Sequence, residues 1–193
     1  QSHINRITSL VNGSAGRTID LPRGTKVLVD YRQIIVFRGE VNSYSPIEGL
    51  LELKMPGETK IGDLRISASI VEKETLKDPA REVLAERSLD CCRQLDKPKV
   101  YLSHSAVAGK VYVRSRRPGD RFQPKGMCGH KKLQDFMVDA HIPRSWRDRV
   151  PLLVTSKGVV WVVGWRIAHW ARVTPKTQRC VMVKFSLGAT SSG

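Results

Sequence analysis

The chain has 193 residues, 40% of them hydrophobic and 26% charged, which excludes a disordered protein and allows one ordinary domain or two small ones. The net charge of +15 restricts the partners to nucleic acid, an anionic membrane surface or an acidic protein. The sequence contains no run of about 18 apolar residues and its start is polar, so we expect a cytoplasmic protein with neither a membrane span nor a signal peptide.

The positive charge is divided unequally along the chain. Residues 1–95 hold 14 Lys and Arg against 13 Asp and Glu, whereas residues 96–193 hold 19 against 5. This contrast predicts a near-neutral domain over 1–95, a linker over 96–107, a basic domain over 108–187 and a mobile tail over 188–193.

The near-neutral region is predicted to be mostly β. Apolar residues at helical spacing over 3–12 indicate the end of a helix. Alternating segments bounded by Pro and Gly predict strands over 18–21, 26–30, 33–37, 49–55 and 64–71, with a turn at 56–57 between the last two. Residues 73–98 are polar and weakly patterned, and a short helix is expected over 82–89.

The basic region mixes strands with short helices. Leu133, Phe136, Met137 and Ala140 have the spacing of an amphipathic helix, which we expect over 131–141, with a second short helix over 143–149. Strands are predicted over 100–102, 110–113, 152–154, 159–163 and 180–185, with a hairpin turn at 155–158. The expected fold class is α+β, with two small β-rich domains.

A dense basic segment lies before the first of these helices. Ten of the twenty positions over 113–132 are Arg, Lys or Gly. Arg presents a planar fork of donors to phosphate oxygens and Lys a point charge, whereas Gly126 and Gly129 allow backbone N–H groups to approach an anion. Lys131 and Lys132 are expected at the helix start, where phosphate is favoured.

These features predict phosphate binding, although a solvated basic surface is the bland alternative. Arg147 is also a candidate for a structural ion pair with Asp139 or Asp148. The predicted phosphate-binding residues are Arg114, Arg116, Arg117, Arg121, Lys125, Lys131, Lys132, Arg144 and Arg147.

Three acidic residues are candidates for chemistry. Asp120 could be catalytic, but an Asp in this setting more often caps a turn or pairs with a neighbouring Arg. Asp135 and Asp139 lie four residues apart, so they could hold a metal ion for a hydrolase. We favour a solvated helix face for both, because they lie opposite the apolar stripe.

Four cysteines form no CxxC pair: Cys91, Cys92, Cys128 and Cys180. Reduced thiols are therefore the favoured interpretation. A zinc site made of the first three with His130 would have no recognised ligand spacing.

The aromatic and imidazole side chains are favoured as packing residues. Trp161, Trp165 and Trp170 could stack on bases, but tryptophans that alternate with valines in a strand more often pack. The lone histidines at 104, 141 and 169 are interpreted as structural.

The string RSRRPGDRFQPKGMCGHKKLQDF over 114–136, with the segments 142–144, 147–152 and 160–167, closely resembles the C-terminal domain of the tRNA(Ile)-lysidine synthetase family. The resemblance covers about 108–187, and residues 18–24 more weakly resemble the end of the family's middle domain. The whole chain then resembles the C-terminal half of such an enzyme.

The resemblance implies a function in tRNA modification. The family joins lysine to the wobble cytidine of an isoleucine tRNA, using ATP and Mg in an N-terminal domain with an SGGxDS-type loop that this sequence lacks. Its C-terminal domains hold the tRNA, and the last one contacts the acceptor-stem side. That last domain is similar in fold to a layered, β-rich domain of phenylalanyl-tRNA synthetase.

We therefore expect a tRNA-binding region with no catalytic residue, metal or cofactor of its own. Isoleucine tRNA is the expected partner, and the sequence is compatible with a homodimer. The alternative is a stand-alone RNA-binding module without catalysis.

Overall fold

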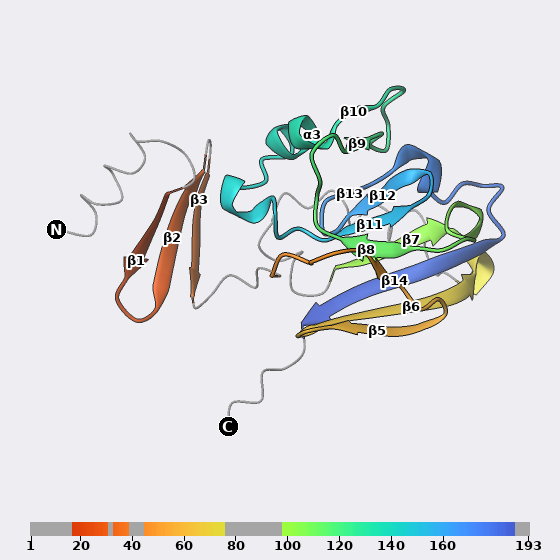
Figure 1. The fold of residues 1–193 in the computed structure, drawn as a ribbon, viewed down its shortest axis with the longest axis horizontal. Coiled ribbons are helices and arrows are strands. Elements are labelled where there is room, and N and C mark those ends of the chain that lie inside the picture. Colours follow the sequence, from red (N-terminus) through yellow and green to blue (C-terminus); the bar gives the residue numbers. More distant parts are fainter. Residues whose placement is uncertain (1–16, 31–32, 39–44, 76–97, 188–193) are drawn as a thin grey trace.

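The structure is a computed structural model that describes residues 17–30, 33–38, 45–75 and 98–187. The helices expected over 3–12 and 82–89, the tail at 188–193, Cys91 and Cys92 lie outside the described residues. The described strands form four antiparallel sheets, and the helices are few and short. This confirms the expected α+β class (Figure 1).

One sheet consists of the first three strands, β1 (Arg17–Leu21), β2 (Thr25–Asp30) and β3 (Gln33–Arg38). Their positions confirm the predicted strands. Val27 and Val29 alternate onto one face of β2 and are buried in a small separate cluster with Ile19 and Leu21.

A second sheet has the order β5-β6-β14-β7. Its strands are β5 (Gly57–Ile61), β6 (Leu64–Glu72), β14 (Arg179–Leu187) and β7 (Lys99–Ser103). The long strand β14 pairs with β6 from Arg179↔Glu72 to Leu187↔Leu64, and with β7 along its other edge.

A third sheet has the order β13-β12-β11-β8-β4. Its strands are β13 (Arg166–Ile167), β12 (Gly158–Val162), β11 (Leu152–Thr155), β8 (Tyr112–Arg114) and β4 (Leu51–Glu52). β12 is buried at every position after Gly158. A continuous apolar run of this kind requires cover on both faces of the strand.

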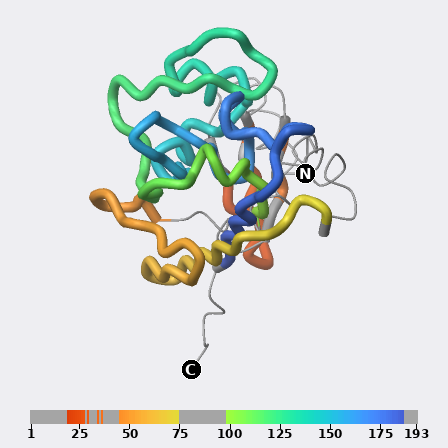
Figure 2. The backbone as a smooth tube through the Cα atoms, turned by 90° about the vertical axis from the view of Figure 1, so that its right-hand side faces the viewer, coloured from red at the N-terminus to blue at the C-terminus, as the bar shows by residue number. Residues whose placement is uncertain are grey.

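The two faces of this sheet are covered by different layers. On one side lie the ribbon of β9 (Arg121–Phe122) and β10 (Lys131–Lys132) and the helix α3 (Leu133–Asp139). On the other side lies the β5-β6-β14-β7 sheet, and Figure 2 shows the same order from the side. Four single 3-10 turns complete the described helical structure, at Lys73–Thr75, His104–Ala106, Arg144–Trp146 and His169–Ala171.

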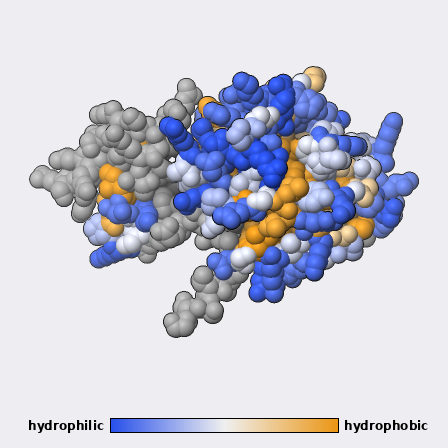
Figure 3. All heavy atoms as spheres, viewed as in Figure 1, coloured by the Kyte–Doolittle hydropathy of each residue, from blue (hydrophilic) through white to orange (hydrophobic). Residues whose placement is uncertain are grey.

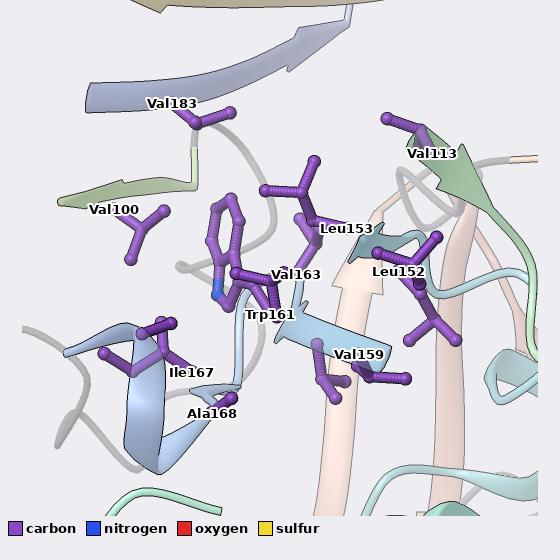
Figure 4. Packing of buried hydrophobic residues seen from close by; sticks show 14 of the residues in the cluster. Val100, Val113, Leu152, Leu153, Val159, Trp161, Val163, Ile167, Ala168 and Val183 are labelled. Carbon is purple, nitrogen blue, oxygen red and sulfur yellow. The ribbon is translucent and has the colours of Figure 1, made fainter. Parts of the chain in front are cut away.

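Trp161 joins the two larger sheets. Its indole, from β12, meets the ring of Phe185 on β14 edge to face, with ring centroids 5.5 Å apart and an interplanar angle of 82°. Figure 4 shows the indole close to Val100 and Val183, which come from β7 and β14. The predicted packing role of Trp161 is confirmed, because the residue is only 2% exposed.

The strand predicted over 100–102 is confirmed as Lys99–Ser103 in the second sheet, so this part of the expected linker over 96–107 is not a linker. One core cluster contains Ile47, Leu64 and Ile66 together with residues from 100 to 185. The predicted boundary was misplaced because the charge contrast reflects residues that mostly lie at the surface, whereas strand pairing depends on the buried ones.

Several predicted elements differ locally from the observed ones. The strand expected over 49–55 has only the two residues of β4, and β5 was missed because its residues, GETKI, are exposed or half-buried. The turn predicted at Pro56-Gly57 corresponds to a bend at Met55-Pro56 that leads into β5, and a second turn at Gly62-Asp63 joins β5 to β6. Lys131 and Lys132 form β10, so the helix begins at Leu133, and the second helix is one 3-10 turn.

Two isoleucines on β6 test whether this strand belongs to the common core. Ile66 is 0% exposed and Ile70 is 40% exposed. Ile66→Ala should lower the free energy of unfolding by about 2–5 kcal/mol. Ile70→Ala should lower it by less than about 1 kcal/mol.

The measurement is urea unfolding followed by tryptophan fluorescence, because all four tryptophans lie within 146–170. If Ile66→Ala left that transition unchanged, β6 would belong to a separate unit.

Candidate nucleic-acid interface

The basic segment is held in shape by an ion pair. At the end of β8, the Arg114 guanidinium donates to both Asp120 carboxylate oxygens, at 2.7 Å each. Asp120 also accepts the backbone N–H of Arg117 at 2.7 Å, closing the turn between them. The two side chains are only 11% and 13% exposed. Asp120 is therefore a turn-capping, paired residue, as predicted.

The environment of Asp120 favours its charged form. Burial by itself raises the pKa of this carboxyl group, whereas the hydrogen bonds from Arg114 and from the Arg117 backbone lower it. With the charges of both arginines, they bring the pKa below its ordinary value of 3.8.

Removing the Asp120 charge should destabilise the basic segment. Asp120→Asn leaves the Arg114 guanidinium without its carboxylate, which should lower the free energy of unfolding by about 2–3 kcal/mol at neutral pH. Because the folded pKa is depressed, this contribution is complete above the ordinary pKa. The contribution of Asp120 to stability is lost as the pH falls through the pKa of its carboxyl group in the folded protein.

Asp135→Asn is the matched control, because Asp135 is an exposed residue on α3. Urea unfolding of both variants between pH 3 and pH 7 is the measurement. Equal stability of the two variants at pH 7 would contradict the assigned role of Asp120.

The β9–β10 ribbon brings two cations together. Arg121 lies directly opposite Lys132 in the antiparallel pairing, and both residues are exposed. Residues that face each other in such a pair point to the same side, and like charges there repel. The backbone N–H of Leu133 donates to the carbonyl oxygen of Asp120 at 2.8 Å, so the capped turn also anchors the end of the ribbon.

Four of the nine predicted binding residues are held either by a carboxylate or, in one case, by a buried contact with a backbone carbonyl. Arg114 is bound to Asp120, Arg116 donates to Asp148 at 2.7 Å, and Lys131 pairs with Asp139. Arg147 is 8% exposed, and its Nε donates to the carbonyl oxygen of Ile142 at 2.9 Å. The acidic partner considered for Arg147 was therefore wrong, because a backbone carbonyl takes that place.

The other predicted residues are more accessible. Arg117, Arg121, Lys132 and Arg144 are exposed, and no ion pair with a carboxylate involves them within the described residues. We refer to these four as the open cations. Lys125 is half-buried. Figure 3 shows mostly hydrophilic residues over β9, β10 and α3.

The glycines of the segment contribute differently from the expectation. Gly126 has a φ of +90°, which favours glycine, but its N–H donates to Nδ1 of His169 at 3.2 Å and is not open to an anion. His169 thus has the structural role expected of it. No atom of the surroundings lies within 4 Å of a Cβ built on Gly129, so that position is open.

A cavity of about 270 Å³ lies beside the ribbon. Arg121 and His130 line it from the basic segment, Lys157 from the turn between β11 and β12, and Trp170 from the 3-10 turn at 169–171. Sequence reasoning missed Lys157, because the predicted hairpin gives no indication that β12 lies against β9 of the ribbon in the tertiary fold.

The remaining candidates do not assemble into a further site. Within the described ranges, no group of three His, Cys, Asp or Glu residues is arranged to hold a metal ion. Cys128 is exposed, whereas burial raises the pKa of the Cys180 thiol and favours its protonated form. Among the described helices, none has the length and apolar character needed to cross a membrane.

Comparison with known proteins shows which proteins the chain is similar to. Residues 111–183 match the family model described as the TilS substrate C-terminal domain. A tRNA(Ile)-lysidine synthase of Dehalococcoides mccartyi is 38% identical over 187 residues, which cover 96% of this chain and 37% of that protein. Most of the chain is thus similar to tRNA(Ile)-lysidine synthases, and residues 111–183 match the C-terminal domain of that family. The chain corresponds to the C-terminal region and spans little more than a third of the relative's length.

Solved structures agree on the fold. A crystal structure of a TilS C-terminal domain matches with a TM-score of 0.53 and 23% identity, over 72% of this chain and 96% of the other. An N-terminal fragment of the phenylalanyl-tRNA synthetase β-subunit from Pyrococcus horikoshii matches with a TM-score of 0.50 and 16% identity, over 63% of this chain and 39% of that fragment. The expected similarity to a phenylalanyl-tRNA synthetase domain is confirmed as a similarity of fold.

Proposed function

We propose that this chain binds tRNA through the open cations Arg117, Arg121, Lys132 and Arg144. The observation that carries the proposal is the opposition of Arg121 and Lys132 across the β9–β10 ribbon. Two like charges held face to face are unfavourable until an anion lies between them. A phosphate group of the RNA backbone supplies that anion, and it matches both the fork of Arg and the point charge of Lys.

The family supports tRNA as the source of the phosphates. The relative from Dehalococcoides mccartyi is a tRNA(Ile)-lysidine synthase, and its similarity extends over most of this chain. We infer that the parent protein ligates lysine to the wobble cytidine of isoleucine tRNA, and that this region holds the tRNA during the reaction. A cytoplasmic location is part of the same proposal, and the homodimer stays a prediction.

Catalysis, ATP and Mg²⁺ are assigned to another part of the parent protein. Around the basic segment, Asp120, Asp139 and Asp148 are each paired with a cation and are therefore not available to bind a metal–nucleotide complex. The described residues include no cluster suited to a metal ion. The role of this region is therefore binding and positioning.

Removing open cations should weaken tRNA binding and its salt dependence together. Each phosphate contact releases counterions, so log K falls with log[salt], and each lost contact reduces the slope by about 1. Arg117→Ala combined with Lys132→Ala should therefore reduce the slope by about 2. The variant should unfold at the same urea concentration as the parent chain.

The control is Lys54→Ala combined with Lys60→Ala, which removes the same charge from exposed positions before and within β5. Affinity for isoleucine tRNA is measured by filter binding over a salt series. Equal slopes for the two double variants would show that net charge, and not the open cations, determines binding.

The chain alone should form no adenylate. Incubation with ATP, Mg²⁺, lysine and isoleucine tRNA should release no pyrophosphate above the level without the chain. Pyrophosphate release that depends on the chain would contradict the assignment of catalysis to another part of the parent.

A further inference from the structure

We propose that the cavity beside the β9–β10 ribbon binds one unpaired nucleotide of the RNA, with its base against Trp170 and its phosphate between Arg121 and Lys157. This inference rests on the proposed function and specifies which part of the RNA this site takes. It concerns a site distinct from the contacts of the other open cations with the backbone.

The cavity has the dimensions of a site for a single nucleotide. Its volume of about 270 Å³ lies just below the range of about 300–1,000 Å³ in which proteins hold drug-sized ligands. A double helix is too large to enter it, and paired bases are stacked inside the helix where a pocket cannot reach them. Only a nucleotide that is already unpaired can enter without the cost of opening the duplex.

The three tryptophans considered for stacking differ in their surroundings. Trp161 is 2% exposed and lies in the core, whereas Trp165 and Trp170 are half-buried at its edge. Of these, Trp170 is the one that lines the cavity. An aromatic side chain fixed on the core and open on one side provides a rigid platform for a base, whatever its identity.

The charges around the cavity suit a phosphate. Arg121 and Lys157 are exposed, and no carboxylate pairs with either in the part of the chain that the structure describes. The one acidic lining residue, Asp120, is neutralised by Arg114. The Arg121 side chain has only a long contact of 3.4 Å with the carbonyl oxygen of His130, which a phosphate can replace.

Polar side chains on the wall can contact the base edge. The Gln123 amide donates to the carbonyl oxygen of Met127 at 3.1 Å, which leaves its own oxygen as an acceptor. His130 is exposed at the rim of the cavity. These groups can form hydrogen bonds with the edge of a base, but their donors and acceptors do not match one base alone. The site should therefore bind different nucleotides with only a modest preference.

The test compares two RNA hairpins with the same stem, one blunt and one with a short single-stranded extension. The full chain should bind the extended hairpin about tenfold more tightly, as expected for one stacked base. Trp170→Leu should abolish this gain and leave binding of the blunt hairpin unchanged. Trp165→Leu is the matched control and should keep the gain, because Trp165 does not line the cavity.

A second pair of variants avoids any change at the core. Lys157→Ala, at an exposed hairpin turn, should reduce the gain by at least threefold, whereas Lys60→Ala on β5 should keep it. Equal affinity of the parent chain for the two hairpins would overturn the nucleotide pocket and leave the proposed function intact. Retention of the full gain in Lys157→Ala or in folded Trp170→Leu would also overturn the pocket. Failure to bind either hairpin at low salt would overturn both proposals.

Discussion

The guanidinium of Arg114 and the carboxylate of Asp120 share two hydrogen bonds of 2.7 Å in a nearly buried position. The same carboxylate accepts the Arg117 N–H, and the Asp120 carbonyl oxygen accepts the N–H of Leu133 at the start of α3. One acidic residue thus connects β8, the basic turn and the helix. Asp148 and Asp139 also pair with cations of this segment, but their side chains are exposed, so Asp120 is the nearly buried carboxylate that opposes the mutual repulsion of the positive charges.

The layered core provides the fixed support for this segment. β8 lies inside the five-stranded sheet, and β12 of that sheet carries Trp161 against Phe185 of the second sheet. α3 places Leu133, Phe136 and Met137 in the core, and Phe122 of the ribbon meets Phe136 with ring centroids 4.9 Å apart. The apolar side of the basic layer is therefore anchored, while Arg121 and Lys132 extend to solvent.

Sequence patterns predicted most strands of the fold but not their partners. The alternation over 180–185 indicated a strand, yet its pairing with β6 joins Phe185 to Ile66, far away in the sequence. Such pairing depends on which faces are buried together, and local propensity does not contain that information. The strand β5 was not predicted because none of its residues is fully buried, so it lacks a pattern of apolar residues.

The position of the basic segment could be predicted from the sequence, but the role of each of its residues could not. Arg116 and Arg117 are neighbours, yet only Arg116 reaches Asp148, 32 positions further along the chain. A count of charges along the sequence cannot distinguish the two arginines, because the tertiary fold determines which of them meets a carboxylate. The same holds for Lys157, which an ordinary hairpin turn brings to the cavity wall.

Binding of tRNA by the unaltered chain is the measurement that tests this account most directly. Affinity should be determined for isoleucine tRNA and an unrelated tRNA, from low to physiological salt. The account predicts binding of both at low salt, with affinity that falls steeply as salt increases and a preference for isoleucine tRNA. Absence of binding at low salt, or an affinity independent of salt, would contradict it.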